Sequence, residues 1–275
     1  MFLVTGATGN VGAELVRALL ATGAPVRALV RGPDAPVPGG ARPVLGDLDD
    51  PGTLAGAFEG VEGVFLLPGR ADMAGLLAGA RDAGVRRVVL VSGGSAALAD
   101  MSNPISRSMT LSERAVRDSG LAWTFLRPRA FMSNALRWAP QLRAGDTVRV
   151  PFPDAPAACV DPRDVAAVAA RALLDRAHRG HVYELTGPQP LRPCDQVAVL
   201  AEVLGRDLRC VGLTDERSRV EMERTMPADY VEAIFRFHRD GTLDESRVRP
   251  DVQEVTGRPP RDFRQWATAH ADAFR

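Results

Sequence analysis

A glycine-rich turn close to the N-terminus constrains the fold of this chain more than any other feature. The turn is Thr5-Gly6-Ala7-Thr8-Gly9-Asn10-Val11-Gly12, and it lies between the apolar run Phe2-Leu3-Val4 and a segment with apolar residues at helical spacing. Gly6 permits a tight turn, Gly9 lets the backbone approach a pyrophosphate, and Gly12 allows the helix to pack closely on the sheet. Because a helix N-terminus also attracts phosphate charge, the segment predicts a dinucleotide-binding turn. A glycine-rich turn that binds nothing is the alternative.

Apolar runs alternate with helical patterns through the first half of the chain, which is typical of βαβ units around a parallel sheet. The runs predict strands at residues 25–30, 43–45, 64–67, 87–91, 123–126 and 182–185. A helix is predicted over 161–177, with Asp161 as the N-cap and Pro162 at the first helical position. From Thr186 onward the pattern is helical and polar, with prolines between its segments.

We therefore expect an α/β protein: a Rossmann doubly wound parallel sheet with a small, mainly helical C-terminal substrate lobe. The expected boundaries are 1–150 for the dinucleotide-binding core and 151–275 for the remainder. That remainder comprises late Rossmann elements at 161–185 and the substrate lobe at 186–275. The whole chain is expected to form one structural unit.

Charge and composition exclude several classes of protein. The 34 acidic and 34 basic residues balance, which argues against a nucleic-acid partner, and every basic residue is arginine because the chain contains no lysine. No run approaches the roughly 20 apolar residues of a membrane span, and a strand at Phe2 leaves no room for a signal peptide. The four histidines have no metal-ligand spacing, so no metal site is expected.

The three cysteines lie far apart in the sequence, which is typical of a reducing compartment. We expect a cytoplasmic protein in which Cys159 and Cys210 are small core residues.

The end of the second strand predicts the choice of dinucleotide. An acidic residue there would bind the ribose 2′-hydroxyl of NAD, whereas an arginine accommodates the 2′-phosphate of NADP. The strand ends in Leu29-Val30-Arg31-Gly32, so the sequence favours NADP(H), with a solvated loop arginine as the alternative. Asp47 and Leu48, after the third strand, are candidates for the adenine site, although Asp47 could equally begin an Asx turn.

Several segments together resemble the NmrA-like branch of the atypical short-chain dehydrogenase/reductases. They are TGATGNVG at 5–12, VR at 30–31, GDL at 46–48, LRPRAFMSN at 126–134, VDPRDVAAVAA at 160–170 and YELTGP at 183–188. The resemblance covers nearly the whole chain. It implies a Rossmann domain of about seven strands, with a C-terminal lobe closing over the nicotinamide.

The resemblance also implies a set of cofactor contacts, with two of them beside the nicotinamide. The implied residues are Gly6, Thr8, Gly9, Asn10, Val11, Gly12, Arg31, Asp47, Leu48, Leu67, Pro68, Gly69, Ser92, Gly93, Gly94, Pro128 and Phe131, the last two near the nicotinamide. The family contains quinone and dye reductases, isoflavone-type reductases and non-enzymatic redox sensors, so membership indicates the cofactor better than the chemistry.

The sequence departs from the usual Tyr/Lys catalytic pair of short-chain dehydrogenases. Its only tyrosines, Tyr183 and Tyr230, lie outside the helix after the fifth strand, where the two positions are expected at Ile105 and Met109. A reaction that needs mainly hydride delivery to a polarised, conjugated acceptor remains open, since the protein then contributes orientation and exclusion of water.

Several polar side chains of the sequence could donate hydrogen bonds to such an acceptor. The candidates are Ser95, Ser112, Arg129 and Asn134, and Ser108 and Arg70 are further candidates. Ser95 could instead be a turn residue and Ser112 a residue of the helix surface, while Glu113 is expected to pair with an arginine. Phe131, Phe152 and His238 are considered for the pocket or its lid, with packing or a surface position as the alternative.

The sequence thus predicts an NADPH-dependent reductase of a small conjugated or aromatic acceptor, such as a quinone or enone. A non-enzymatic NADP(H) redox sensor and a non-redox tailoring enzyme on the same fold are the alternatives. A monomer or homodimer is expected.

Overall fold

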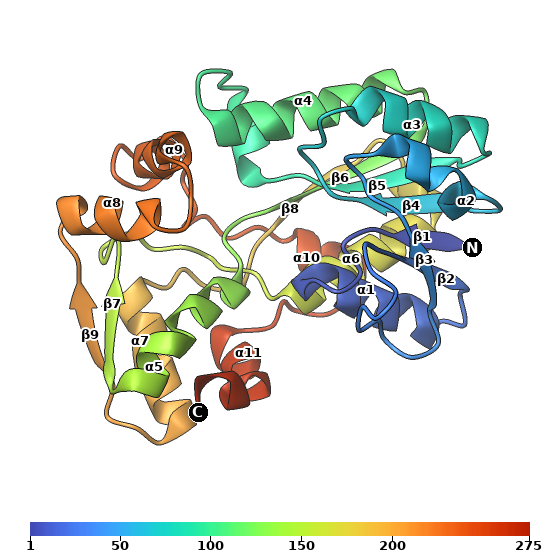
Figure 1. Cartoon of the computed structure of the whole chain (residues 1–275). Coiled ribbons are helices and arrows are strands. Elements are labelled where there is room, and N and C mark those ends of the chain that lie inside the picture. The colour runs from blue at the N-terminus through green and yellow to red at the C-terminus, as the bar shows by residue number, and fades with distance from the viewer.

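The computed structural model describes residues 1–275 and contains a seven-stranded parallel sheet (Figure 1). The strand order is β3-β2-β1-β4-β5-β6-β8. Strands β2 and β3 are added on one side of β1 and the later strands on the other side, so the order switches between β1 and β4, as in doubly wound folds. The strands are β1 (Phe2–Val4), β2 (Val26–Val30), β3 (Arg42–Leu45), β4 (Gly63–Leu66), β5 (Arg87–Val91), β6 (Ala122–Pro128) and β8 (Val182–Leu185). The predicted strands and the Rossmann class are confirmed, and most strand ends agree to within two residues.

Helices cover both faces of the sheet, so its inner strands are buried on both sides. One face carries α1 (Asn10–Ala21), α6 (Pro162–Leu174) and α10 (Asp251–Thr256), and the other carries α2 (Ala55–Phe58), α3 (Met73–Asp82) and α4 (Pro104–Asp118). Short 3₁₀ helices, η1 (Pro51–Leu54), η2 (Gly94–Leu98) and η4 (Arg176–His178), complete this part. The continuous apolar runs of β1, β4 and β5 follow from this double burial.

The start of α6 is built as its sequence predicts. The carboxylate of Asp161 accepts a hydrogen bond from the Arg163 N–H, and Pro162 occupies the first turn. Arg261, far along the chain, donates from Nε to Asp161 at 2.7 Å and from its backbone N–H to Asp164 at 2.7 Å. The C-terminal segment is thereby anchored to the sheet domain.

The lobe contains more than the predicted helices. Its elements are η3 (Met132–Trp138), α5 (Ala139–Ala144), β7 (Thr147–Val150), α7 (Pro193–Leu204), β9 (Arg209–Gly212), α8 (Asp215–Glu223), α9 (Ala228–His238), α11 (Phe263–Ala269) and η5 (Ala271–Phe274). Strands β7 and β9 pair in parallel, and a separate core runs from Met132 to Phe274. Residues 132–150 therefore pack with the lobe, which differs from the boundary expected at residue 150. Neither short strand was predicted, because each finds its partner some 60 residues away.

The cysteines also differ from expectation. Cys159 is buried and free, as predicted, but Cys194 and Cys210 form a disulfide that ties the start of α7 to β9. The expectation that Cys210 is an unpaired core residue is therefore wrong. A separation of 16 residues concealed the pair, since α7 folds back against β9 only in the tertiary structure.

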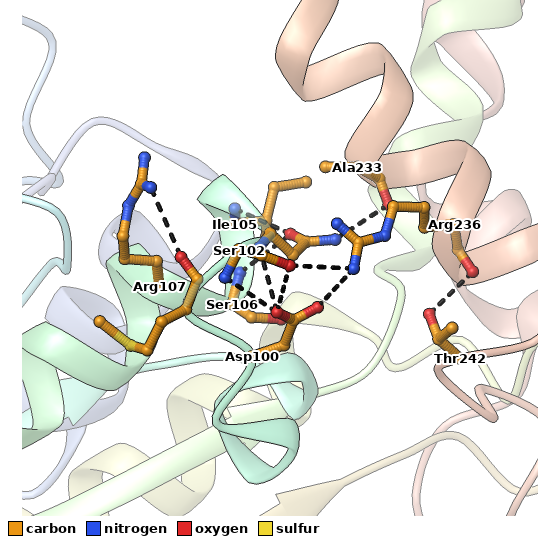
Figure 2. A network of polar contacts seen from close by, with 10 residues as sticks. Asp100, Ser102, Ile105, Ser106, Arg107, Ala233, Arg236 and Thr242 are labelled. Carbon is orange, nitrogen blue, oxygen red and sulfur yellow. Dashed lines mark hydrogen bonds and ion pairs between the residues drawn. The ribbon is translucent and has the colours of Figure 1, made fainter.

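A polar network joins the lobe to the sheet domain (Figure 2). Arg236 of α9 donates to the carboxylate of Asp100 at 2.8 Å and to the Ser102 hydroxyl at 3.1 Å. The buried Asn103 accepts hydrogen bonds at the start of α4 from the backbone N–H groups of Ile105 and Ser106. Its amide also donates to the carbonyl oxygen of Ala233 at 3.3 Å. One side chain therefore caps α4 and holds α9.

Replacing Asn103 should reveal both roles in the free energy of unfolding. Asn103→Ala removes the cap and the bond to Ala233, each worth about 1 kcal/mol, so a loss of about 2 kcal/mol is expected in urea denaturation. Asn103→Ser keeps a capping oxygen but is too short to hold Ala233, and should lose about half as much. No loss in Asn103→Ser would show that the contact with α9 contributes nothing, and equal losses in the two variants would show the same of the cap.

Candidate functional site: a dinucleotide cleft and a cavity in the lobe

The glycine-rich turn has the backbone geometry that its sequence predicts. Gly6 adopts a φ of +61°, and the Gly9 N–H donates to the Gly6 carbonyl oxygen at 2.9 Å. A Cβ atom on Gly12 would lie 2.1 Å from that same oxygen, so only glycine allows α1 to pack here. Asn10 begins α1, and Val11 packs against the core beneath it. The N-terminus of α1 is consequently held at the carboxyl end of β1.

The Thr5 side chain fixes this turn to the neighbouring strand. Its hydroxyl donates to the Phe65 carbonyl oxygen at 2.9 Å and accepts from the Leu67 N–H at 3.2 Å. The turns after β1 and β4 are thus one rigid unit at the point where the strand order reverses.

A cavity of about 470 Å³ opens beside the turn, at the carboxyl ends of β2 and β3. It brings together six of the predicted cofactor residues: Gly6, Thr8, Arg31, Asp47, Leu48 and Leu67. Arg31 is exposed at this cavity and makes no ion pair with the rest of the chain. Asp47 accepts a hydrogen bond from the Asp49 N–H, so it lines the cavity and also forms the Asx turn that was its alternative. Arg70 lines the same cavity and pairs with Asp49 at 3.1 Å.

The loops after β4 and β5 follow next along the carboxyl edge of the sheet. Gly69 has a φ of +76°, and its N–H donates to the Ser112 hydroxyl at 2.9 Å. Ser112 in turn donates to the Ser108 carbonyl oxygen at 2.8 Å. It is buried and holds the Pro68-Gly69 turn from α4, so the alternative that placed it on the helix surface is wrong.

Ser92 and Ser95 lie in the loop after β5 and are both buried. The Ser92 hydroxyl is buried without a hydrogen-bond partner, which fits a group that would bind a ligand. Beside Gly93, the nearest side chain is Met109, whose Cγ and Sδ would contact a Cβ there at 3.6 and 3.7 Å. A thioether therefore occupies the place where the lysine of the usual pair is expected.

Arg129 follows β6 and is almost fully buried, with 8% of its surface exposed. A Cβ atom on Gly94 would lie 2.6 Å from its Nη1, so the guanidinium faces the loop after β5 directly. Its ion pair with Glu184 is long, at 3.5 Å, whereas Arg249 binds the same carboxylate at 2.6 Å. The Nε of Arg129 has no partner. This buried cation is therefore only partly neutralised.

The other residues near the end of β6 differ in their surroundings. Pro128 ends the strand and is buried, and Phe131 forms a bridge to Val160. Asn134 is exposed on η3 and makes no side-chain hydrogen bond. The predicted pairing of Glu113 with arginine is confirmed, because its buried carboxylate accepts two hydrogen bonds from Arg127 at 2.8 and 2.7 Å.

A second cavity, of about 490 Å³, lies within the lobe. Phe152 and His238 line it, and their rings lie 5.0 Å apart. Phe152 has a φ of +49°, a strained backbone conformation of the kind that clusters at ligand sites. Burial, followed by the charge of Arg137, lowers the pKa of His238, so its imidazole is neutral at neutral pH.

Sequence analysis missed the third important side chain of this cavity, Glu245. Its carbonyl oxygen accepts from the Ala158 N–H at 2.8 Å, which holds it beside the end of β6. Burial raises the pKa of its carboxyl, and the nearby charge of Arg129 opposes this only in part. No local pattern in the segment 241–249 marks this residue, because a long connection brings it to the site.

The cleft fits a dinucleotide on several independent grounds. The glycines leave an open face at a helix N-terminus, Arg31 has no competing partner, and the Ser92 hydroxyl is unsatisfied. No His, Cys, Asp or Glu side chains gather as a metal cluster, and no helix combines the length and apolar composition that a membrane span requires.

Comparison with known proteins identifies the family. A family model described as NAD(P)H-binding matches residues 6–176. The chain is 45% identical to a (4-alkanoyl-5-oxo-2,5-dihydrofuran-3-yl)methyl phosphate reductase from Streptomyces griseus, covering 100% of this chain and 99% of that protein. It is 37% identical to an NAD(P)H azoreductase from Xenophilus azovorans, covering 100% and 99%.

The fold is shared with solved structures of the same kind. An NADPH-dependent quinone oxidoreductase from Escherichia coli superposes with a TM-score of 0.79 and 25% identity, covering 98% of this chain and 99% of that chain. These findings confirm the resemblance drawn from the sequence motifs. The chain therefore belongs to the NAD(P)H-binding family and is an NAD(P)H-dependent oxidoreductase.

Proposed function

We propose that this protein uses NADPH to reduce a small conjugated carbonyl compound of the enone or quinone type. The observation that carries the proposal is the partly neutralised, buried guanidinium of Arg129, which lies beside the loop after β5 in a cleft that lacks the Tyr/Lys pair. The Streptomyces griseus relative supports it, since the butenolide in that protein's name is a conjugated enone lactone.

The predicted contacts would divide among the parts of the cofactor. We assign Arg31, Asp47 and Leu48 to the adenosine 2′-phosphate and adenine, and the turn at 6–12 to the pyrophosphate. The remaining predicted contacts, Leu67, Pro68, Gly69, Ser92, Gly93, Gly94, Pro128 and Phe131, follow along the strand ends toward the nicotinamide. When bound, NADPH supplies the hydride.

Arg129 would stabilise the negative charge that develops on the acceptor's carbonyl oxygen during hydride transfer. A fixed cation in a site shielded from water is more effective than solvent, because it is already oriented before the reaction. Arg129 cannot supply a proton, since an arginine side chain does not deprotonate in proteins. Ser112 is less suited as a donor to substrate, because its hydroxyl already accepts from the Gly69 N–H and donates to the Ser108 carbonyl oxygen.

The cytoplasm remains the proposed location. A monomer or homodimer remains the proposed state.

Reduction itself is tested by following NADPH absorbance with a panel of butenolides, linear enones and quinones. Acceptor-dependent consumption of NADPH is expected. Gly9→Val should abolish it, because the added side chain would occupy the face proposed to meet the pyrophosphate. Firm NADPH binding without any consumption would refute the reductase and favour the redox-sensor alternative.

The role of Arg31 is tested by cofactor affinity. Arg31→Ala should raise the Kd for NADPH about 10- to 100-fold, as expected for loss of a hydrogen bond to a charged group, and leave the Kd for NADH unchanged. Isothermal titration of the two cofactors measures this. A parallel weakening of both would place Arg31 away from the 2′-phosphate.

Arg129→Gln should lower kcat/KM about 10²- to 10³-fold, the usual cost of removing one donor to a developing oxyanion. Its partner Glu184 keeps Arg249, so the variant should fold. Arg249→Gln is the matched control, since it disturbs the same carboxylate without contacting Gly94. If both variants lost activity equally, the effect would come from Glu184 and not from the Arg129 guanidinium.

A further inference from the structure

Reduction of a conjugated carbonyl compound leaves the acceptor one proton short, and the residues described so far do not supply it. The usual tyrosine is absent, and Ile105 stands at its expected position. Arg129 holds its protons permanently. Asn134 is an amide and does not ionise in the physiological range. A group able to donate a proton must therefore come from another part of the crevice.

We propose that Glu245 is the general acid that protonates the reduced substrate. The inference rests on the proposed function and deepens it, by naming the residue that does the work of the missing tyrosine.

The position of Glu245 follows from the contacts of its backbone. The Ala158 N–H donates to its carbonyl oxygen at 2.8 Å, and the Gly187 N–H donates to the Ala158 carbonyl oxygen at 3.0 Å. Residues 157–160 run beside the end of β6, where Val160 bridges to Phe131. Glu245 is thereby held at the carboxyl end of the sheet, although it belongs to the connection between α9 and α10.

Arg129 connects Glu245 to the cofactor cleft. Its guanidinium lies against Gly94, and its charge acts on the carboxyls of Asp244 and Glu245. An acceptor whose carbonyl oxygen is bound by Arg129 would therefore lie close to the loop after β5 and within reach of the segment that carries Glu245. This is the arrangement that hydride delivery and proton delivery to one small molecule require.

The Glu245 carboxyl has no competing role in the fold. It makes no hydrogen bond and no ion pair with another side chain, whereas Asp244 accepts from Ser246 at 2.6 and 2.9 Å and Asp215 pairs with Arg239 at 2.9 Å. Glu245 lines the lobe cavity, so solvent has a path by which to return the proton.

The surroundings favour the protonated form of Glu245. Burial raises its pKa, and the facing charges are the Arg129 guanidinium, which lowers the pKa, and the acidic lining of the cavity. The titratable groups of that lining are Asp154, Asp215, His238, Arg239 and Asp244. The nearby Cys159 thiol stays neutral, because burial raises its pKa to about 12. His238 is a poor acid here, since its pKa is lowered and its ring already neutral.

The reaction balances with one hydride and one proton. The hydride pair forms a C–H bond at the β-carbon of the acceptor, and the π electrons move to the carbonyl oxygen to give an enolate beside Arg129. Glu245 then gives its proton to the enolate and becomes a carboxylate. The carboxylate regains a proton from water through the cavity. The acceptor is reduced by two electrons and NADPH is oxidised to NADP⁺.

The test compares Glu245→Gln with wild type on an acceptor that wild type reduces. We expect kcat/KM to fall about 10²- to 10⁴-fold, the usual contribution of a positioned general acid. Because the acid must be protonated, wild-type kcat/KM should be level at low pH and fall as the pH rises through the raised pKa of Glu245. That fall should be absent from Glu245→Gln. Glu254→Gln, the same change on the exposed face of α10, is the control and should behave as wild type.

A second measurement does not depend on turnover. Protein labelled with ¹³C at the glutamate carboxyls should show one resonance that titrates above the ordinary glutamate range, and this resonance should disappear in Glu245→Gln. An unchanged pH profile in Glu245→Gln, or a Glu245 resonance that titrates in the ordinary range, would overturn the assignment. Failure of wild type to reduce any acceptor would instead refute the proposed function.

Discussion

The fold depends on the close approach of α1 to the turn that precedes it. The backbone of Gly12 packs against the carbonyl group of Gly6 with no space for a side chain between them. This contact sets the height of the α1 N-terminus above the sheet, while Thr5 fixes the adjoining turn of β4. The carboxyl ends of β1, β4, β5 and β6 lie along one edge of this parallel sheet, where doubly wound folds bind their ligands.

The end of β6 is the second organising point, and it shows how this chain manages without a tyrosine and a lysine. In the usual pair, one phenol both stabilises the substrate oxygen and delivers the proton, with a lysine to tune it. Here the two tasks would be divided between Arg129, a permanent cation, and Glu245, a carboxyl whose pKa is raised by burial. Such a division suits acceptors whose charge and proton are received at different atoms, as in conjugated carbonyl compounds.

Local sequence patterns predicted the sheet domain well, because each of its strands and helices has its own apolar run and its own cap. Asp161 and Pro162 mark the start of α6, and the glycines of the first turn mark the dinucleotide cleft. The lobe was less accessible to prediction. Strands β7 and β9 and the disulfide depend on partners brought together by tertiary packing.

The same limit applies to individual site residues. Ser112 has the sequence context of a helix surface, and only the packing of the β4 turn against α4 reveals its hydrogen bond to Gly69. Glu245 lies in a connection without periodicity, and its surroundings depend on the backbone of Ala158 and on the charge of Arg129. A residue whose environment comes from several distant segments leaves no mark in the local sequence.

The double role of Asn103 has a consequence for recombining domains of this family. Helix α4 is held at its first turn by the residue that also binds α9, and farther along it holds the cofactor loop through Ser112. The lobe and the cofactor cleft are therefore set by opposite parts of one rigid element. A chimera that takes its lobe from a relative would mismatch the hydrogen bonds between the start of α4 and α9, unless residues 100–106 were exchanged together with α9.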